Sequence, residues 1–222
     1  MPELPPIFIA ALTGFISGFL LSVPVGPINL TIMNEGARRG FKWAALIGLG
    51  AVIMEVIYCA IAFTGFASLF GNRFIKASME VFSFVFMLYL GCKFLLAKAI
   101  PAHTRMEESL EKRLHPHSAF MTGFVRTMGN PGVLLFWIIL AANFMSREWV
   151  MPNGHGKAAC ILGVAGGTGI WFFGLSWAVS LGHRKFSEKT LLKMEHFSGL
   201  CLLLLGVAHG LHIAWQMANR EM

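Results

Sequence analysis

Charged side chains are scarce in this sequence. Only 13% of the 222 residues are Asp, Glu, Lys or Arg, whereas 56% are hydrophobic. A soluble domain usually carries about 25% charged residues, so this composition argues against one. The apolar residues occur in blocks of about 20, which is the length that an α-helix needs to cross a bilayer. The sequence therefore predicts an all-α, polytopic protein that has the lipid bilayer as its surroundings.

Six apolar stretches are long enough to be membrane-spanning helices. They cover approximately 7–33, 43–70, 75–98, 119–145, 157–181 and 191–215. The N-terminal residues Met1–Pro6 lack the basic segment that begins a secretory signal. We therefore expect the first stretch to remain in the membrane as a helix.

The motifs of several enzyme classes are missing. The four cysteines, Cys59, Cys92, Cys160 and Cys201, fall within apolar stretches and form no Cys-x-x-Cys pair, so apolar packing is their expected role. Neither G-x-x-x-x-G-K-[ST] nor H-E-x-x-H occurs, which argues against direct ATP drive and against an intramembrane zinc protease. We expect no catalytic residue, no metal and no cofactor.

The basic residues of the chain indicate its orientation. The formal net charge is +7, but the basic residues lie in loops, so membrane orientation explains them more simply than a nucleic-acid partner. Eleven lysines and arginines lie in the first, third and fifth loops, against five on the other side. The positive-inside rule then places the 99–118 loop in the cytoplasm and both termini outside the cell (inner) membrane.

The two halves of the chain resemble each other. Residues Met79–Ser83 match Met194–Ser198, and Thr13–Phe15 recurs as Thr122–Phe124. Short matches in the same order support an ancestral duplication. Each half contains three spans, an odd number, so the second copy enters the membrane in the opposite orientation. We expect two inverted three-helix repeats with the first and fourth helices broken.

A polar segment at 99–118 divides these repeats. Its charges are mixed, which is typical of a solvated linker, with or without a short surface helix. The expected units are therefore 1–98 as the first repeat, 99–118 as a cytoplasmic linker and 119–222 as the second repeat.

The first predicted break is Pro24-Val25-Gly26-Pro27. Each proline removes a backbone N–H and clashes with the preceding turn. Non-helical backbone survives at membrane depth only where it is buried in protein or lines a cavity. A half-helix that begins at Pro27 would offer free N–H groups and a positive dipole end to a carboxylate. Pro24, Gly26, Pro27 and Asn29 are therefore candidate substrate-binding residues, with a simple kink as the alternative.

The second predicted break is Asn130-Pro131-Gly132 in the fourth stretch. Interrupted apolar segments in corresponding positions of two halves indicate a transporter site near the membrane midplane. Asn130 supplies both amide donors and an acceptor. We add Pro131 and Trp137 to the candidate site, with packing or an interfacial position as the more ordinary role of Trp137.

Two charged residues lie within the spans. Glu55 is in the middle of the second one, where a charge costs about 2.5–3.5 kcal/mol and usually faces a cavity or a partner. It could bind an ammonium group, carry a proton or form a structural ion pair with Arg126. Arg126 itself could bind a carboxylate through two hydrogen bonds or extend to the cytoplasmic headgroups.

With these motifs the chain resembles the lysine exporter (LysE/RhtB) family of amino-acid translocators. The resemblance covers essentially the whole chain. It is carried by Gly18 to Asn29 with the Pro-Val-Gly-Pro core, by Gly36 to Gly40, by Gly123-Phe124 followed by Asn130-Pro131, and by Phe136-Trp137. The family implies export of amino acids or close derivatives, driven by the proton gradient or the membrane potential.

The resemblance implies six site residues in this chain, at the positions that match the family motif: Pro24, Gly26, Pro27, Asn29, Asn130 and Pro131. Arg126 departs from the mostly uncharged run that is expected before Asn-Pro, which leaves the charge class of the substrate open.

The leading hypothesis is thus a secondary exporter of amino acids or similar small zwitterions, acting as a monomer or a homo-oligomer. A metal-cation exporter is an alternative, but it would need more intramembrane carboxylates or thiols than Glu55 alone. A membrane thiol-disulfide electron carrier is another, and it would need paired reactive cysteines beside the helix breaks.

Overall fold

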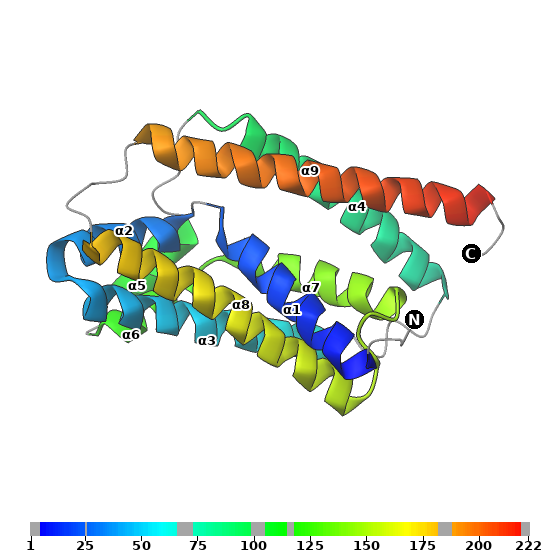
Figure 1. Ribbon diagram of the computed structural model, residues 1–222, viewed down its shortest axis with the longest axis horizontal. Helices are drawn as coiled ribbons and strands as arrows, with labels where there is room; N and C mark the ends of the chain where they lie inside the picture. Colours follow the sequence, from blue (N-terminus) through cyan, green and yellow to red (C-terminus); the bar gives the residue numbers. More distant parts are fainter. Residues whose placement is uncertain are drawn as a thin grey trace.

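A computed structural model describes residues 5–24, 26–65, 73–98, 105–114, 118–181 and 188–218. In these ranges the chain forms helices and no strands (Figure 1). The helices are α1 (Pro6–Ser22), α2 (Pro27–Arg39), α3 (Phe41–Gly65), α4 (Arg73–Leu95), α5 (Arg105–Leu114), α6 (Ala119–Met128), α7 (Pro131–Ser146), α8 (Gly154–Leu181) and α9 (Glu188–Ala218). The all-α prediction is confirmed for this part of the chain. Both termini, and 99–104 and 115–117 of the predicted linker, lie outside the described residues.

Both predicted helix breaks are present. Helices α1 and α2 meet at an angle of 71°, and α6 and α7 meet at 66°. In each pair a proline, Pro27 or Pro131, is the first residue of the second helix. Proline is favoured there because its missing N–H is one that the first helical turn leaves unpaired in any case.

The count of spanning helices is lower than expected. Among the described residues, three helices are long and apolar enough to cross a membrane, namely α3, α8 and the Leu192–Trp215 part of α9. The number rises to five if each bent pair counts as one span. Helix α4, at the predicted third span, is not among them, and its sequence includes Arg73, Lys76, Glu80 and Lys93. Length and composition thus support a multi-pass membrane protein without establishing six spans.

Glycines bring two pairs of helices into backbone contact. A Cβ atom added at Gly14 would lie 2.0 Å from the carbonyl oxygen of Cys160, and one added at Gly123 would lie 1.9 Å from that of Ile47. Helix α1 therefore packs on α8, and α6 packs on α3. Small residues allow such close approach between membrane helices. In both pairs the helix before a break packs on an unbroken helix from the other half of the chain.

Glycines on the partner helices α8 and α3 make the same kind of contact with α1 and α6. A Cβ atom at Gly163 on α8 would lie 2.0 Å from the carbonyl oxygen of Ala11, and one at Gly50 on α3 would lie 2.1 Å from that of Phe120. The α1–α8 and α3–α6 pairs therefore use the same arrangement of glycine and carbonyl.

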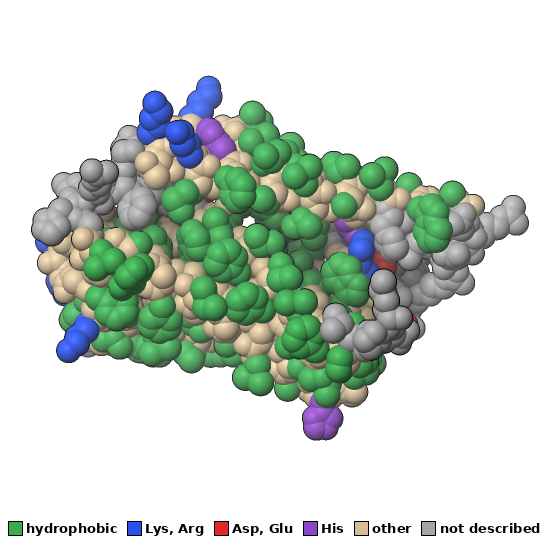
Figure 2. Space-filling model, in the orientation of Figure 1, with side chains coloured by type: hydrophobic (Ala, Val, Ile, Leu, Met, Phe, Trp, Pro, Cys, Tyr) green, Lys and Arg blue, Asp and Glu red, His purple; other side chains and the backbone are tan. Residues whose placement is uncertain are grey.

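Helices α4 and α9 form a third pair along one side of the bundle (Figure 1). Here Gly91 faces Leu203, with 2.6 Å from an added Cβ to the Leu203 Cγ, and Gly206 faces Leu88 at 3.2 Å. Helix α4 also contacts α7. Its outer face carries large exposed apolar side chains, such as Phe82, and hydrophobic side chains cover most of the face seen in Figure 2.

Candidate functional site

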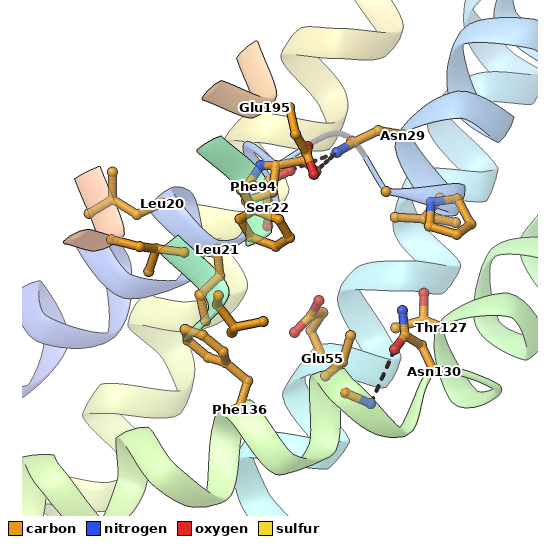
Figure 3. Close-up of a pocket in the computed structure, with 18 of the residues that line it drawn as sticks. Leu20, Leu21, Ser22, Asn29, Glu55, Phe94, Thr127, Asn130, Phe136 and Glu195 are labelled. Atoms are coloured by element: carbon orange, nitrogen blue, oxygen red, sulfur yellow. Dashed lines mark hydrogen bonds between the residues drawn. The ribbon is translucent and has the colours of Figure 1, made fainter. Parts of the chain in front are cut away.

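A cavity of about 720 Å³ lies among the two helix breaks, α3, and the α4–α9 pair (Figure 3). Eight of the nine predicted site residues line it: Pro24, Gly26, Pro27, Asn29, Glu55, Arg126, Asn130 and Trp137. Pro131, the first residue of α7, is exposed and does not line it. The two breaks, which are far apart in the sequence, thus border one space.

The first break is a short extended segment. Gly26 has φ −94° and ψ −176° and precedes the first helical residue of α2, Pro27. Its N–H donates to the carbonyl oxygen of Pro24 at 2.9 Å, and its own carbonyl accepts from the N–H of Leu30 at 3.1 Å. Among the described residues, no atom lies within 4 Å of a Cβ built at Gly26. A side chain at this position would therefore extend into open space beside the cavity.

Asn29 stabilises this break from inside the protein. Its Nδ2 donates to the carbonyl oxygens of Ser22, at 2.8 Å, and Pro24, at 2.6 Å. Its Oδ1 accepts from the indole N–H of Trp171 at 3.1 Å. The side chain is 2% exposed, and both of its amide hydrogens are used. Asn29 therefore holds the carbonyl groups at the end of α1 in place. It also lines the cavity, and its contact with a substrate stays a prediction.

Asn130 has a different arrangement at the second break. Its Oδ1 accepts from the N–H of Gly132 at 3.1 Å, so it caps the start of α7. Among the described residues, its Nδ2 donates to no protein acceptor. Asn130 is partly exposed and lines the cavity (Figure 3). Its amide group is thus available to a ligand.

Glu55 borders the cavity from α3. It is 7% exposed, and its carboxylate accepts a hydrogen bond from the indole N–H of Trp137, which is fully buried on α7. An ionised carboxylate has about four acceptor positions, so this bond leaves capacity for a further donor. Glu55 was predicted to face a cavity or a partner. It does both, because it lines the cavity and accepts a hydrogen bond from Trp137.

Arg126 contacts other residues than Glu55. Its guanidinium pairs with Glu111 on α5 at 3.0 Å and donates to the hydroxyl of Thr31 on α2. The described residues contain no ion pair between Glu55 and Arg126, so the alternative of a structural pair is wrong. The sequence could not reveal the true partner, since Glu111 lies in a segment that appeared to be solvated.

Sequence reasoning missed most of the other lining residues, including several polar ones. Thr127 is 4% exposed, and its hydroxyl has no partner among the described residues. Lys93 on α4 and Glu195 on α9 also line the cavity. Glu195 lies inside the repeated Met194–Ser198 segment, which is the signal that could have identified it.

The residues that the alternative functions need do not gather at the cavity, although Cys59 and Cys160 contact each other elsewhere in the core. No group of three His, Cys, Asp or Glu side chains in the described part of the chain is placed to hold a metal ion. Cys59 and Cys160 are buried in the apolar core, and neither lines the cavity. The described lining combines carboxylates, cationic groups, amides, hydroxyls and apolar walls.

Several known proteins have similar sequences. The chain is 26% identical to the putative amino acid efflux protein YcgF of Bacillus subtilis, over 90% of this chain and 94% of that protein. It is 28% identical to the arginine exporter protein ArgO of Shigella flexneri, over 73% and 74% of the two chains. It is also 28% identical to the leucine efflux protein of Salmonella choleraesuis, over 57% and 58%.

No solved structure matches the chain. The family model of the LysE type translocator matches residues 19–212, which is most of the sequence. Because that match includes both helix breaks and the cavity between them, the chain belongs to the LysE type translocator family.

Proposed function

We propose that this protein exports amino acids or related small zwitterions across the cell (inner) membrane, driven by the proton gradient or the membrane potential. Proteins of its family are translocators rather than enzymes, and relatives are named for efflux of amino acids, leucine and arginine. The cavity between the breaks is where the substrate binds.

The single observation that carries this proposal is the position of Glu55. It supplies a carboxylate to a cavity that both helix breaks line, where it can bind the ammonium group of a substrate or the coupling proton. The substrate carboxylate would be held by the amide of Asn130 and by the N-terminus of α2 after Pro27, where free N–H groups and the helix dipole favour an anion. Holding both charges of the zwitterion offsets the cost of removing it from water.

The proposed architecture is a pair of inverted repeats, 1–98 and 119–222, joined by the 99–118 linker and giving six spans. The reciprocal glycine contacts support it, because Gly14 with Cys160 has its counterpart in Gly123 with Ile47. Gly91 with Leu203 likewise has its counterpart in Gly206 with Leu88. Alternating access would move one repeat against the other around the central site.

The proposed orientation puts the linker in the cytoplasm and both termini outside. Single cysteines at Glu108 on α5 and at His155 on α8, both exposed, test it on a cysteine-free background. An impermeant thiol reagent applied to intact cells should label the cysteine at 155 and spare the one at 108. The opposite labelling pattern would show that the chain has the reverse orientation.

Glu55→Gln tests the proposed function, because glutamine keeps the shape and can still accept from Trp137 but cannot hold a charge. We expect the purified variant to remain folded and to lose proton-coupled export in proteoliposomes. Glu35→Gln is the matched control, since Glu35 pairs with Arg39 at 3.1 Å and does not line the cavity. Wild-type export by a well-folded Glu55→Gln variant would eliminate the proposed role of Glu55.

A further inference from the structure

The cavity has an apolar wall on α4 and α9, the helices that also contribute Lys93 and Glu195 to its lining. Phe86, Leu90 and Phe94 from α4 and Leu202 from α9 form part of it. Phe86 also packs against Phe136 on α7, with ring centroids 6.0 Å apart. From this arrangement we infer that the exported amino acids are those with a large apolar side chain, aliphatic or aromatic. The inference rests on the proposed function and names the substrate class of the same site.

The polar and apolar groups are separated in one part of the cavity, whereas Glu195 and Ser22 lie beside Phe94 in another (Figure 3). Figure 3 shows Thr127 and Asn130 on one side and Leu20, Leu21 and Phe136 on the other. Glu55 projects into the space between the two sides in that view. An amino acid with its ammonium and carboxylate groups at Glu55 and Asn130 would direct its side chain toward the apolar wall. A hydrophobic side chain gains there by leaving water.

Size does not select the substrate at this site. The cavity volume of about 720 Å³ lies within the usual range for small-molecule sites, about 300–1,000 Å³, and exceeds what any single amino acid needs. Selection must then come from the chemistry of the walls. One additional substrate methylene in an apolar pocket raises kcat/KM by roughly 10–200-fold over a substrate that lacks it.

Charge at the site does not favour an ionised side chain. The ionisable residues in the described lining are Glu55, Lys93, Arg126 and Glu195, two of each sign. Glu195 already takes part in an interaction of its own, and Glu55 is needed for the ammonium group. A cationic side chain would therefore reach the apolar wall without a carboxylate reserved for it. For an anionic side chain, Arg126 is already paired with Glu111, and Lys93 is exposed at the cavity rather than within the apolar wall. Burying either charge unpaired is costly.

A panel of labelled amino acids tests the inference. The full-length protein would be reconstituted in proteoliposomes with an imposed proton gradient and membrane potential, and offered leucine, phenylalanine, glycine, arginine and aspartate. We expect kcat/KM for leucine and phenylalanine to exceed that for glycine, arginine and aspartate by about tenfold or more. Equal or better transport of arginine, aspartate or glycine would overturn this inference and leave the proposed function standing. Transport of none of the five would overturn both.

Alanine variants on α9 locate the selectivity. Leu202→Ala shortens a side chain that lines the cavity, whereas Leu204→Ala shortens one that is 63% exposed on the outer surface of the same helix. We expect Leu202→Ala to lower the preference for leucine over glycine by about tenfold, with the preference unchanged in Leu204→Ala. Both variants would first be shown to be monodisperse by size-exclusion chromatography. A folded Leu202→Ala protein that keeps the full leucine preference would contradict the inference.

Discussion

The indole N–H of Trp137 on α7 donates a hydrogen bond to the carboxylate of Glu55 on α3. Trp137 is fully buried and Glu55 is 7% exposed, so the bond lies where water cannot replace it. It joins an unbroken helix from the first half of the chain to the broken helix of the second half. The carboxylate that the proposed mechanism needs is therefore held by a residue from the opposite half.

Trp137→Phe should remove this bond and keep most of the apolar contact. A buried acceptor that loses its donor costs about 1–3 kcal/mol, so we expect a lower melting temperature and impaired export. Differential scanning fluorimetry and proteoliposome transport measure the two effects. Trp177→Phe, at a position on α8 that is 60% exposed, is the control and should change neither. Unchanged stability and transport in Trp137→Phe would show that Glu55 does not depend on the indole.

Gly14→Ala and Gly123→Ala should each destabilise the fold. The added methyl group would meet a backbone carbonyl oxygen at 2.0 Å and 1.9 Å respectively, so the helices must separate. Overpacking of this kind typically costs about 1–3 kcal/mol. Gly174→Ala adds the same group on α8 where no described atom lies within 4 Å. Detergent-solubilised yield and melting temperature should fall for the first two variants and hold for the third.

Asn130→Asp separates capping from substrate binding. Aspartate retains the oxygen that caps α7 through the N–H of Gly132, but it replaces the amide donor with a negative charge. We expect a melting temperature close to wild type together with an increase in KM of about tenfold or more, because a substrate carboxylate would lose its donor and meet repulsion. Transport with an unchanged KM would remove Asn130 from the binding site.

Asn29→Ala should show the opposite pattern. It leaves the carbonyls of Ser22 and Pro24 and the indole N–H of Trp171 without their partners. Each unsatisfied buried group costs about 1–3 kcal/mol, so we expect loss of folded protein rather than a selective change in substrate affinity. A stable Asn29→Ala protein with only a raised KM would instead assign Asn29 to substrate binding.

Glu111→Ala should loosen the contact between α5 and the helices beside the second break. The Glu111 and Arg126 side chains are 31% and 15% exposed, so water competes with this pair only in part. Hydrogen exchange should become faster in Arg105–Leu114. Glu108→Ala changes an exposed acidic residue of the same helix and should leave the exchange rates as they are. Equal exchange in both variants would mean that Glu111 does not anchor α5.

The sequence predicted the features that depend on local chemistry. Prolines break helices wherever they occur in the interior, so the positions of both breaks followed from Pro24, Pro27 and Pro131. A carboxylate in a long apolar segment has few acceptable surroundings, so Glu55 was expected beside a cavity or a partner. In both cases the physical constraint acts within one segment and needs no knowledge of the packing.

The sequence could not predict which way an amide points or which distant residue it meets. Asn29 and Asn130 are the same residue type next to a proline break. The amide of Asn29 donates to backbone carbonyl groups inside the protein, whereas the amide of Asn130 faces the cavity. The partner of Arg126 was equally hidden, because a mixed-charge linker gives no sign that Glu111 contacts the membrane domain. These outcomes depend on the angle between helices, which periodicity does not encode.

The crossed packing of the two halves has a consequence for how the protein is made. Gly14 on α1 packs against Cys160 on α8, and α8 is synthesised only after the whole first half and the linker. Helix α1 is therefore inserted into the bilayer before its partner α8 has been made. Lipid covers the glycine surface of α1 until α8 is inserted. Neither half has its complete set of packing partners when alone, so two separately expressed halves should be degraded singly and rescued only when they are produced together.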